Sequence, residues 1–354
     1  MAQRNQVCGS GVSSLRLQPL NVRNLPSPYR EVLEREVKKL KKRDDVLAIG
    51  LAGSVSRGDF WHGADLDIEV VLKGDKPKNL VCTEQEISVD FAYFGESQIE
   101  NLPHDTRPIY DPTHVLTKTL RKRTKRQLWQ TMIQKNTNST ERCLQKARSA
   151  LRSDPYSALC HIQNGSAELA SNLVLATGTA PSIRRTISKL EAAMNKIRRS
   201  DLFDEYVSIY GMPETLQKTD FLYEQLKQGY REVWPYMNEK AVGPAYMVQQ
   251  SSSEPWFRNR IQPIFEHDKR DLVWIVLIEY PFILRFIFNT IGIDDLPERI
   301  FSPFTNLSGP PTYWINRYRR ILNLVPKSSV PHLLSTAEKL DAEVKKLAGK
   351  KYLN

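Results

Sequence analysis

Residues 47–72 read LAIGLAGSVSRGDFWHGADLDIEVVL and contain two apolar runs separated by a polar turn. The first run ends at Gly53 and Ser54, and the second opens with two aspartates, Asp65 and Asp67. Because successive residues of a strand point to opposite faces, Asp65 and Asp67 share one face while their neighbours point into the core. Two adjacent carboxylates repel each other unless a cation lies between them. The stretch therefore predicts a strand, a turn and a second strand that carries a cation site.

The residue types around this turn suit a nucleotide as well as a cation. Carboxylate oxygens are ligands for Mg²⁺, which typically binds one or two of them together with the phosphates of a nucleotide. Gly53 allows backbone N–H groups to approach a phosphate closely, and a helix start after it would favour an anion. Arg57 adds a positive charge that could contact the same phosphates.

The order Gly-Ser, short spacer, Asp-x-Asp closely resembles the signature of the nucleotidyltransferase superfamily related to DNA polymerase β. With Gly53-Ser54 and Asp65-x-Asp67, the chain is most similar to the minimal and kanamycin-type nucleotidyltransferases. Those proteins commonly have serine just before the first aspartate, where this chain has Ala64. The departure weakens a local hydrogen bond and leaves the carboxylates in place.

The resemblance requires a third carboxylate from a later, neighbouring strand. Residues 87–94 (ISVDFAYF) form a β-rich run with a single acid, Asp90. Taken singly, Gly-Ser is usually a turn, Asp-x-Asp a solvated loop, and a lone strand aspartate a surface residue. All three occur here in order, each within or at the end of an apolar strand, and this combination favours the functional interpretation.

The resemblance also implies a reaction and a set of roles. A nucleoside monophosphate, which we expect to be AMP from ATP, passes to a hydroxyl acceptor with release of pyrophosphate, and two Mg²⁺ ions are the cofactors. By its position, Asp90 could also take the proton from the acceptor hydroxyl. The expected residues are the catalytic metal ligands Asp65, Asp67 and Asp90 and the nucleotide-binding residues Gly53, Ser54 and Arg57.

Composition describes an ordinary globular chain of 354 residues and 40.8 kDa, long enough for two or three domains. The net charge of +11 suggests anionic partners: a nucleoside triphosphate, RNA or a membrane surface. The four cysteines show no CxxC spacing, which argues against a zinc site or a disulfide framework. Together with the lack of an apolar signal segment near the start, this predicts a cytoplasmic protein.

The expected fold class is α+β, a small mixed β-sheet followed by a helical bundle. We expect a flexible tail at 1–26, the nucleotidyltransferase domain at 27–120, a helical bundle at 121–240, and a mainly helical region of unknown role at 241–354. A bundle after the catalytic sheet resembles the architecture of kanamycin-type enzymes.

Apolar spacing and capping residues predict the helices individually. Ser27 is expected to cap the first helix, and Asp154 is expected to start a helix that runs toward Thr177 and ends at Gly178. The first helix is expected at 27–43, and further helices are expected at 141–151, 182–199, 203–236 and 335–350. Residues 108–112 are expected to be the last strand, with Asp111 in a strand-end turn and not in catalysis.

Several polar residues of the bundle have both a functional and an ordinary explanation. Glu168 could be a base, and Arg184, Arg185 and Lys189 could reach a phosphate, but an exposed position on an amphipathic helix is the preferred reading for all four. His161 has no second ligand at metal spacing, so we expect a core residue.

Two longer stretches are ambiguous. The basic run at 118–126 could meet a triphosphate or nucleic acid, or could be the solvated start of a helix. The apolar run at 272–293 approaches the length of a membrane span, but Glu279, Pro281 and Arg285 interrupt it. A buried helix pair or a contact in a homodimer is the better interpretation, and no membrane partner is expected.

Three functions stay open. The first is nucleotide transfer to a small hydroxylated acceptor of the aminoglycoside kind. The second is transfer to a tRNA end or a protein hydroxyl, which the basic charge would favour. The third is a non-catalytic, nucleotide-binding or antitoxin-like module, against which the intact acids argue.

Overall fold

The computed structural model describes residues 22–74, 79–84, 87–103, 105–122, 125–212, 214–239, 252–278, 310–326 and 329–349. Most of the predicted tail and the apolar run beyond Ile278 lie outside these residues. So do residues 75–78, whose sequence DKPK predicts a turn. So does most of the polar stretch at 240–256, which the sequence predicts to be a linker or exposed loop.

The N-terminal part contains a five-stranded mixed sheet with the strand order β3-β4-β2-β1-β5. Strands β2 and β4 are parallel neighbours, and the other adjacent pairs are antiparallel. The strands are β1 (Val46–Ala52), β2 (Leu66–Leu72), β3 (Asn79–Glu84), β4 (Ser88–Gly95) and β5 (Arg107–Tyr110). The expected α+β class is confirmed.

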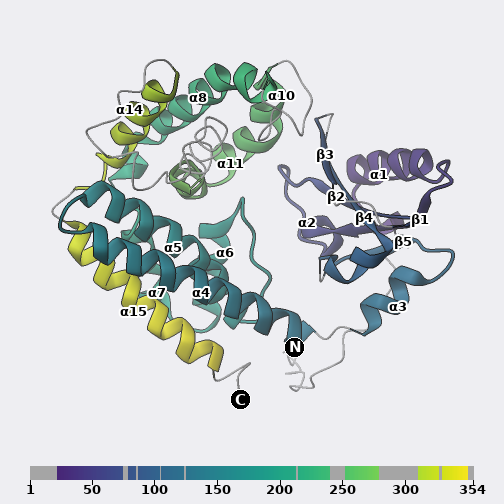
Figure 1. Cartoon of the computed structure of the whole chain (residues 1–354), viewed down its shortest axis with the longest axis horizontal. Coiled ribbons are helices and arrows are strands. Elements are labelled where there is room, and N and C mark those ends of the chain that lie inside the picture. Colours follow the sequence, from purple (N-terminus) through teal and green to yellow (C-terminus); the bar gives the residue numbers. More distant parts are fainter. Residues whose placement is uncertain are drawn as a thin grey trace, which may run out of the picture.

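Helices cover both faces of this sheet (Figure 1). Helix α1 (Ser27–Leu40) packs against the side chains at even-numbered positions of β2, among them Leu66 and Ile68. Helix α3 (Val115–Arg121) and the 3-10 helix η2 (Glu96–Asn101) pack on the opposite face. The predicted alternation along β2 is therefore confirmed, because Leu66 and Ile68 pack in the core with α1 while Asp67 between them points to the other face.

One local expectation in this part is wrong, and one strand was not predicted. Helix α1 begins at Ser27 itself, and the Ser27 hydroxyl contacts the Glu31 carboxylate one turn later, so it caps no backbone N–H. The sequence reading also missed β3. Among the described residues this strand lies at the edge of the sheet and pairs with β4, and its short sequence, NLVCTE, does not alternate between apolar and polar residues.

The C-terminal part is helical. Its elements are α4 (Lys125–Ala150), α5 (Pro155–Ala176), α6 (Thr186–Lys196), α7 (Ser200–Ser208), η3 (Thr215–Lys218), α8 (Thr219–Glu239), α10 (Glu254–Trp256), the π-helical turn η4 (Phe257–Ile261), α11 (Gln262–His267), a helical stretch at 269–278, α14 (Pro310–Leu322) and α15 (Val330–Ala348).

Helix α5 begins and ends where the sequence predicts. The Asp154 carboxylate accepts hydrogen bonds from the backbone N–H groups of Tyr156 and Ser157, and Gly178 follows the helix with φ +85°. The single helix expected over 203–236 is instead α7, η3 and α8. Gly211 adopts φ +60° between them, a left-handed conformation that ends α7.

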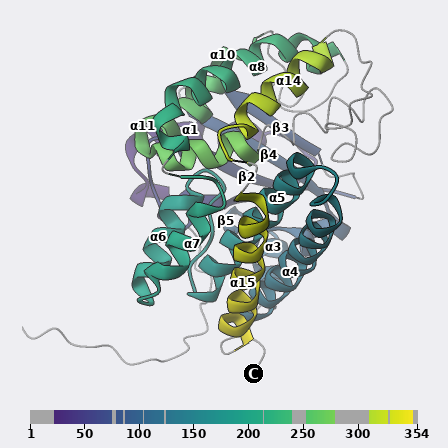
Figure 2. The same cartoon turned by 90° about the vertical axis from the view of Figure 1, so that its left-hand side faces the viewer.

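One apolar core joins the helical elements, from Leu144 on α4 to Val344 on α15. Figures 1 and 2 show α15 lying along α4 and α5, although α5 ends at Ala176 and α15 begins only at Val330. The C-terminal helix therefore packs into the same core as the predicted bundle, and the boundary at residue 240 stays a prediction. No helix within the described residues combines the length and apolar character needed to cross a bilayer.

Candidate active site

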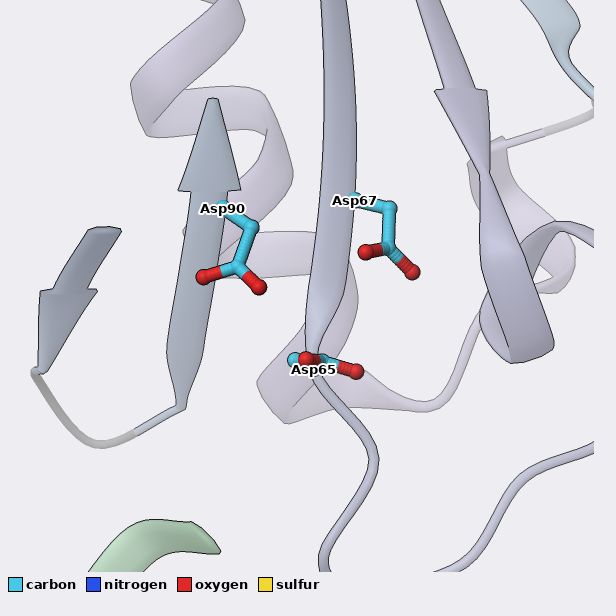
Figure 3. A group of neighbouring side chains, drawn as sticks. All are labelled: Asp65, Asp67 and Asp90. Carbon is cyan, nitrogen blue, oxygen red and sulfur yellow. The ribbon is translucent and has the colours of Figure 1, made fainter. Parts of the chain in front are cut away.

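Three carboxylates converge at the start of two parallel strands (Figure 3). Asp67 on β2 lies directly opposite Asp90 on β4 in the strand register, and Asp65 immediately precedes β2. Each offers a carboxylate oxygen, and the three oxygens lie within 4.8 Å of one another. These residues, the acidic triad, could hold a divalent cation, because close carboxylate oxygens are the ligands that such ions prefer.

Burial and mutual repulsion perturb the acidic triad. Burial, together with the charges of Asp65 and Asp90, raises the pKa of Asp67 well above its ordinary value. Burial would also raise the pKa of Asp90, but the hydrogen bonds and charge of Arg260 outweigh it, so this pKa lies below the ordinary value. A cation would relieve the repulsion at Asp67.

The turn after β1 fits closely around the triad. Gly53 has φ +71° and opens the short helix α2 (Gly53–Ser56), with Ser54 as its second residue. A Cβ atom at position 53 would lie 1.7 Å from Oδ2 of Asp67. The glycine is therefore required both by the backbone conformation and by the position of the carboxylate.

Arg57 lies just after this helix, and its guanidinium contacts the carboxylate of Asp105. Ser56 connects the same two segments, since its hydroxyl lies within hydrogen-bond distance of the carbonyls of Gly53 and Asp105, at 2.9 and 3.0 Å. The segment before β5 therefore supports the turn. A contact of Arg57 or Ser54 with phosphate stays a prediction.

Two arginines from the helical part reach the acidic triad. Nη2 of Arg184 lies 2.7 Å from Oδ2 of Asp65, and Nη1 donates to the carbonyl of Gly63 at 3.2 Å. Both Nη atoms of Arg260 donate to the carboxylate of Asp90, with Nη1 3.0 Å from Oδ2. Nη1 also lies 3.4 Å from Oδ2 of Asp65. The triad is therefore bridged to the helical part by positive charge.

The sequence reading missed Arg260. It lies in the π-helical turn η4, its side chain is only 3% exposed, and it stacks on Trp256 with 4.5 Å between the guanidinium carbon and the ring centroid. The local sequence, FRNR, is polar and reads as a surface turn. Single π-helical turns within helices often occur at functional sites, but this turn becomes visible only in the structure.

A second group of charges joins the two parts beside the triad. Arg185 and Lys189 lie 2.8 and 2.6 Å from Oδ2 of Asp59, and Arg185 also stacks over Trp61. Burial would raise the pKa of Asp59, but these two cations lower it below the ordinary value. The solvent-exposed positions preferred for Arg184, Arg185 and Lys189 from the sequence are wrong, because all three side chains are largely buried against the sheet domain.

The other polar candidates lie outside this cluster. Asp111 accepts from the backbone N–H groups of Leu116 and Thr117, which confirms its role in the turn before α3. His161 is buried, as expected, and burial lowers its pKa to about 4. Glu168 on α5 is half-buried, and burial raises its pKa. Among the described residues, only the acidic triad groups three or more potential metal ligands.

Residues 31–127 match the family model of the nucleotidyltransferase domain. The match spans most of α1, the whole sheet, α3 and the start of α4, and it contains the complete acidic triad. It supports the expected place of this segment in the polymerase β-like superfamily. Among curated proteins, no relative of the chain was found.

The nucleotidyltransferase domain therefore contributes the acids and the glycine turn, and the helical part contributes the cations. The domain match and the triad together support metal-dependent transfer of a nucleoside monophosphate. The kanamycin-type subfamily stays a prediction.

Proposed function

We propose that this chain transfers a nucleoside monophosphate from a nucleoside triphosphate, which we expect to be ATP, to a hydroxyl acceptor and releases pyrophosphate. One observation carries the proposal: Asp65, Asp67 and Asp90 converge beside the Gly53 turn within a segment that matches the nucleotidyltransferase domain.

The donor set fits two Mg²⁺ ions. All three ligands are hard carboxylate oxygens, their spacing is close, and burial together with repulsion among them raises the pKa of Asp67. When bound, such ions would neutralise phosphate charge and so favour attack by an oxygen nucleophile. Asp65, Asp67 and Asp90 would hold them.

The chain's own residues position the reactants. The Gly53 turn brings backbone close to the triad, where its N–H groups could steady the phosphates together with Ser54. In the ligand-free chain the pKa of Asp90 is low because Arg260 stabilises its charged form. Asp90 would serve as a cation ligand, and by its position it could also take the proton from the acceptor hydroxyl.

Two kinds of acceptor are candidates. The resemblance to kanamycin-type enzymes supports a small hydroxylated molecule of the aminoglycoside kind. A second candidate, transfer to tRNA or a protein hydroxyl, is favoured by exposed cations on and around α3 and α4, which suit an anionic macromolecule. These cations are Lys118, Arg121, Lys122 and Arg126. A homodimer and a cytoplasmic location stay predictions.

A transfer assay tests the proposal. The purified chain is incubated with each α-³²P-labelled nucleoside triphosphate, Mg²⁺, and separate pools of aminoglycosides, polyols and tRNA. We expect label from ATP on a small molecule. Label on RNA or on protein would support the second candidate instead, and nucleotide binding with no transfer to any pool would support the non-catalytic module.

Two perturbations and one control variant test whether the triad and a divalent cation are needed for transfer. Asp67→Asn and chelation by EDTA are each expected to lower transfer by roughly a hundredfold or more, since the charge-stabilising site is lost. Asp201→Asn removes an exposed acid in the first turn of α7 that pairs with Arg199, outside the triad, and should leave transfer unchanged. Transfer that persists in Asp67→Asn would contradict the proposed function.

A further inference from the structure

The two arginines at the triad use the oxygen atoms that a metal ion would need. Arg184 lies against Oδ2 of Asp65, and Arg260 engages both oxygens of Asp90 as well as Oδ2 of Asp65. A carboxylate lone pair directed at a guanidinium is not available to a divalent cation at the same time. The guanidinium contacts at Asp65 and Asp90 therefore compete with cations bound there.

A displaced guanidinium at this position needs another anion. Arg260 is 3% exposed and fixed by its stack on Trp256, so it cannot move out into solvent without losing that packing. An arginine left buried without a counter-charge is strongly destabilising. The planar fork of arginine pairs with phosphate oxygens as well as with carboxylates.

We propose that Arg184 and Arg260 form the polyphosphate-binding site of this protein: they neutralise Asp65 and Asp90 in the ligand-free chain and bind the phosphates of a nucleoside triphosphate when divalent cations occupy those carboxylates. This inference rests on the proposed function, because that function brings a triphosphate to the triad. It assigns the helical part a direct share in substrate binding, since both arginines belong to it.

The exchange predicts opposite effects on two ligands. Removing either guanidinium removes a competitor for the triad, so cation affinity without nucleotide should rise. Removing it also removes a phosphate partner, so nucleotide affinity in the presence of the cation should fall. General damage to the fold would weaken both affinities, and this difference separates a binding role from a merely structural one.

The test uses the full chain and the variants Arg184→Gln and Arg260→Gln. Free Mn²⁺ measured by electron paramagnetic resonance reports cation affinity. Equilibrium dialysis with Mn²⁺ and an ATP analogue whose α–β bridging oxygen is replaced by methylene reports nucleotide affinity. We expect Mn²⁺ affinity to rise roughly fivefold or more, as is usual for coupled binding. Affinity for the analogue should fall roughly ten- to a hundredfold, as is usual for hydrogen bonds between charged groups.

Lys189→Gln is the matched control. Lys189 belongs to the same interface but pairs with Asp59, outside the triad, so its loss should leave Mn²⁺ affinity within about twofold of the native value. If the buried position 260 does not tolerate glutamine, Arg260→Lys retains the charge without the fork and should lower nucleotide affinity while the protein stays folded. Arg184→Gln tests the inference independently of position 260.

The outcomes are separable from those of the transfer assay. Opposite shifts in the two affinities support the inference even if no tested acceptor receives a nucleotide. Unchanged nucleotide affinity in both arginine variants, or Mn²⁺ affinity that falls in them, overturns it even if the native chain transfers nucleotides.

Discussion

The α-carbon of Gly53 lies so close to Asp67 that a Cβ atom there would approach its Oδ2 to 1.7 Å. The Asp67 carboxylate can therefore occupy this position only because residue 53 has no Cβ atom. The turn and the acidic triad depend on each other although 14 positions separate Gly53 from Asp67 in the sequence, because Ala52 pairs with Asp67 across β1 and β2.

Gly53→Ala should displace the Asp67 carboxylate and lower both Mn²⁺ affinity and transfer by roughly 10- to 100-fold, the range typical for residues that support metal ligands. Gly74→Ala is the control, because Gly74 has nearly the same φ, +74°, with nothing near the added methyl group. Both variants should lose about 1 to 2 kcal/mol of stability from left-handed backbone strain. Equal transfer by the two variants would show that the contact with Asp67 is unimportant.

Asp90→Asn should destabilise the cation-free protein by about 3 kcal/mol, because it leaves the guanidinium of Arg260 buried with reduced charge compensation. The measurement is urea unfolding in EDTA. Asp201→Asn provides the comparison at an exposed ion pair and should cost less than about 1 kcal/mol. Similar losses in the two variants would mean that the Arg260 contact contributes little to stability.

Asp271 should make stability depend on pH. Its carboxylate accepts from the backbone N–H of Ile187 at 2.6 Å and lies 2.6 Å from the Ser188 hydroxyl, which anchors the start of α6 beside Arg184 and Arg185. Burial raises its pKa to about 6. The folded state therefore binds a proton more readily than the unfolded chain, and this contribution to stability falls as pH rises from about 4 to about 6.

Relative to Asp271→Asn, the native protein should therefore lose about 3 kcal/mol of its free energy of unfolding as pH rises from about 4 to about 6. This figure corresponds to roughly two pKa units at 1.36 kcal/mol each. Urea titrations at several pH values measure this difference. A difference that is constant with pH would contradict the raised pKa.

His161 should act in the opposite direction. Burial lowers its pKa to about 4, so the folded state resists protonation and the contribution of His161 is lost as pH falls from about 6.5 to about 4. His161→Gln should therefore reduce the loss of stability on acidification, and His332→Gln, at an exposed position, should not. A proton NMR titration that places the imidazole pKa near 6.5 would contradict this prediction.

The sequence was sufficient wherever the signal is local. Alternation along residues 66–72 defines the faces of β2, and Asp154 followed by proline predicts the start of α5. It was insufficient for β3, whose residues NLVCTE do not alternate between apolar and polar types, and for the break at Gly211, where helical spacing continues on both sides.

The sequence by itself determined the acids and the glycine turn, because strand periodicity and left-handed backbone are properties of neighbouring residues. Only the tertiary structure decided what faces them. Arg184 lies 119 residues from Asp65, and Arg260 lies 170 residues from Asp90. Such pairs are selected by packing between distant helices and by the need to compensate buried charge, and neither leaves a periodic trace in the chain.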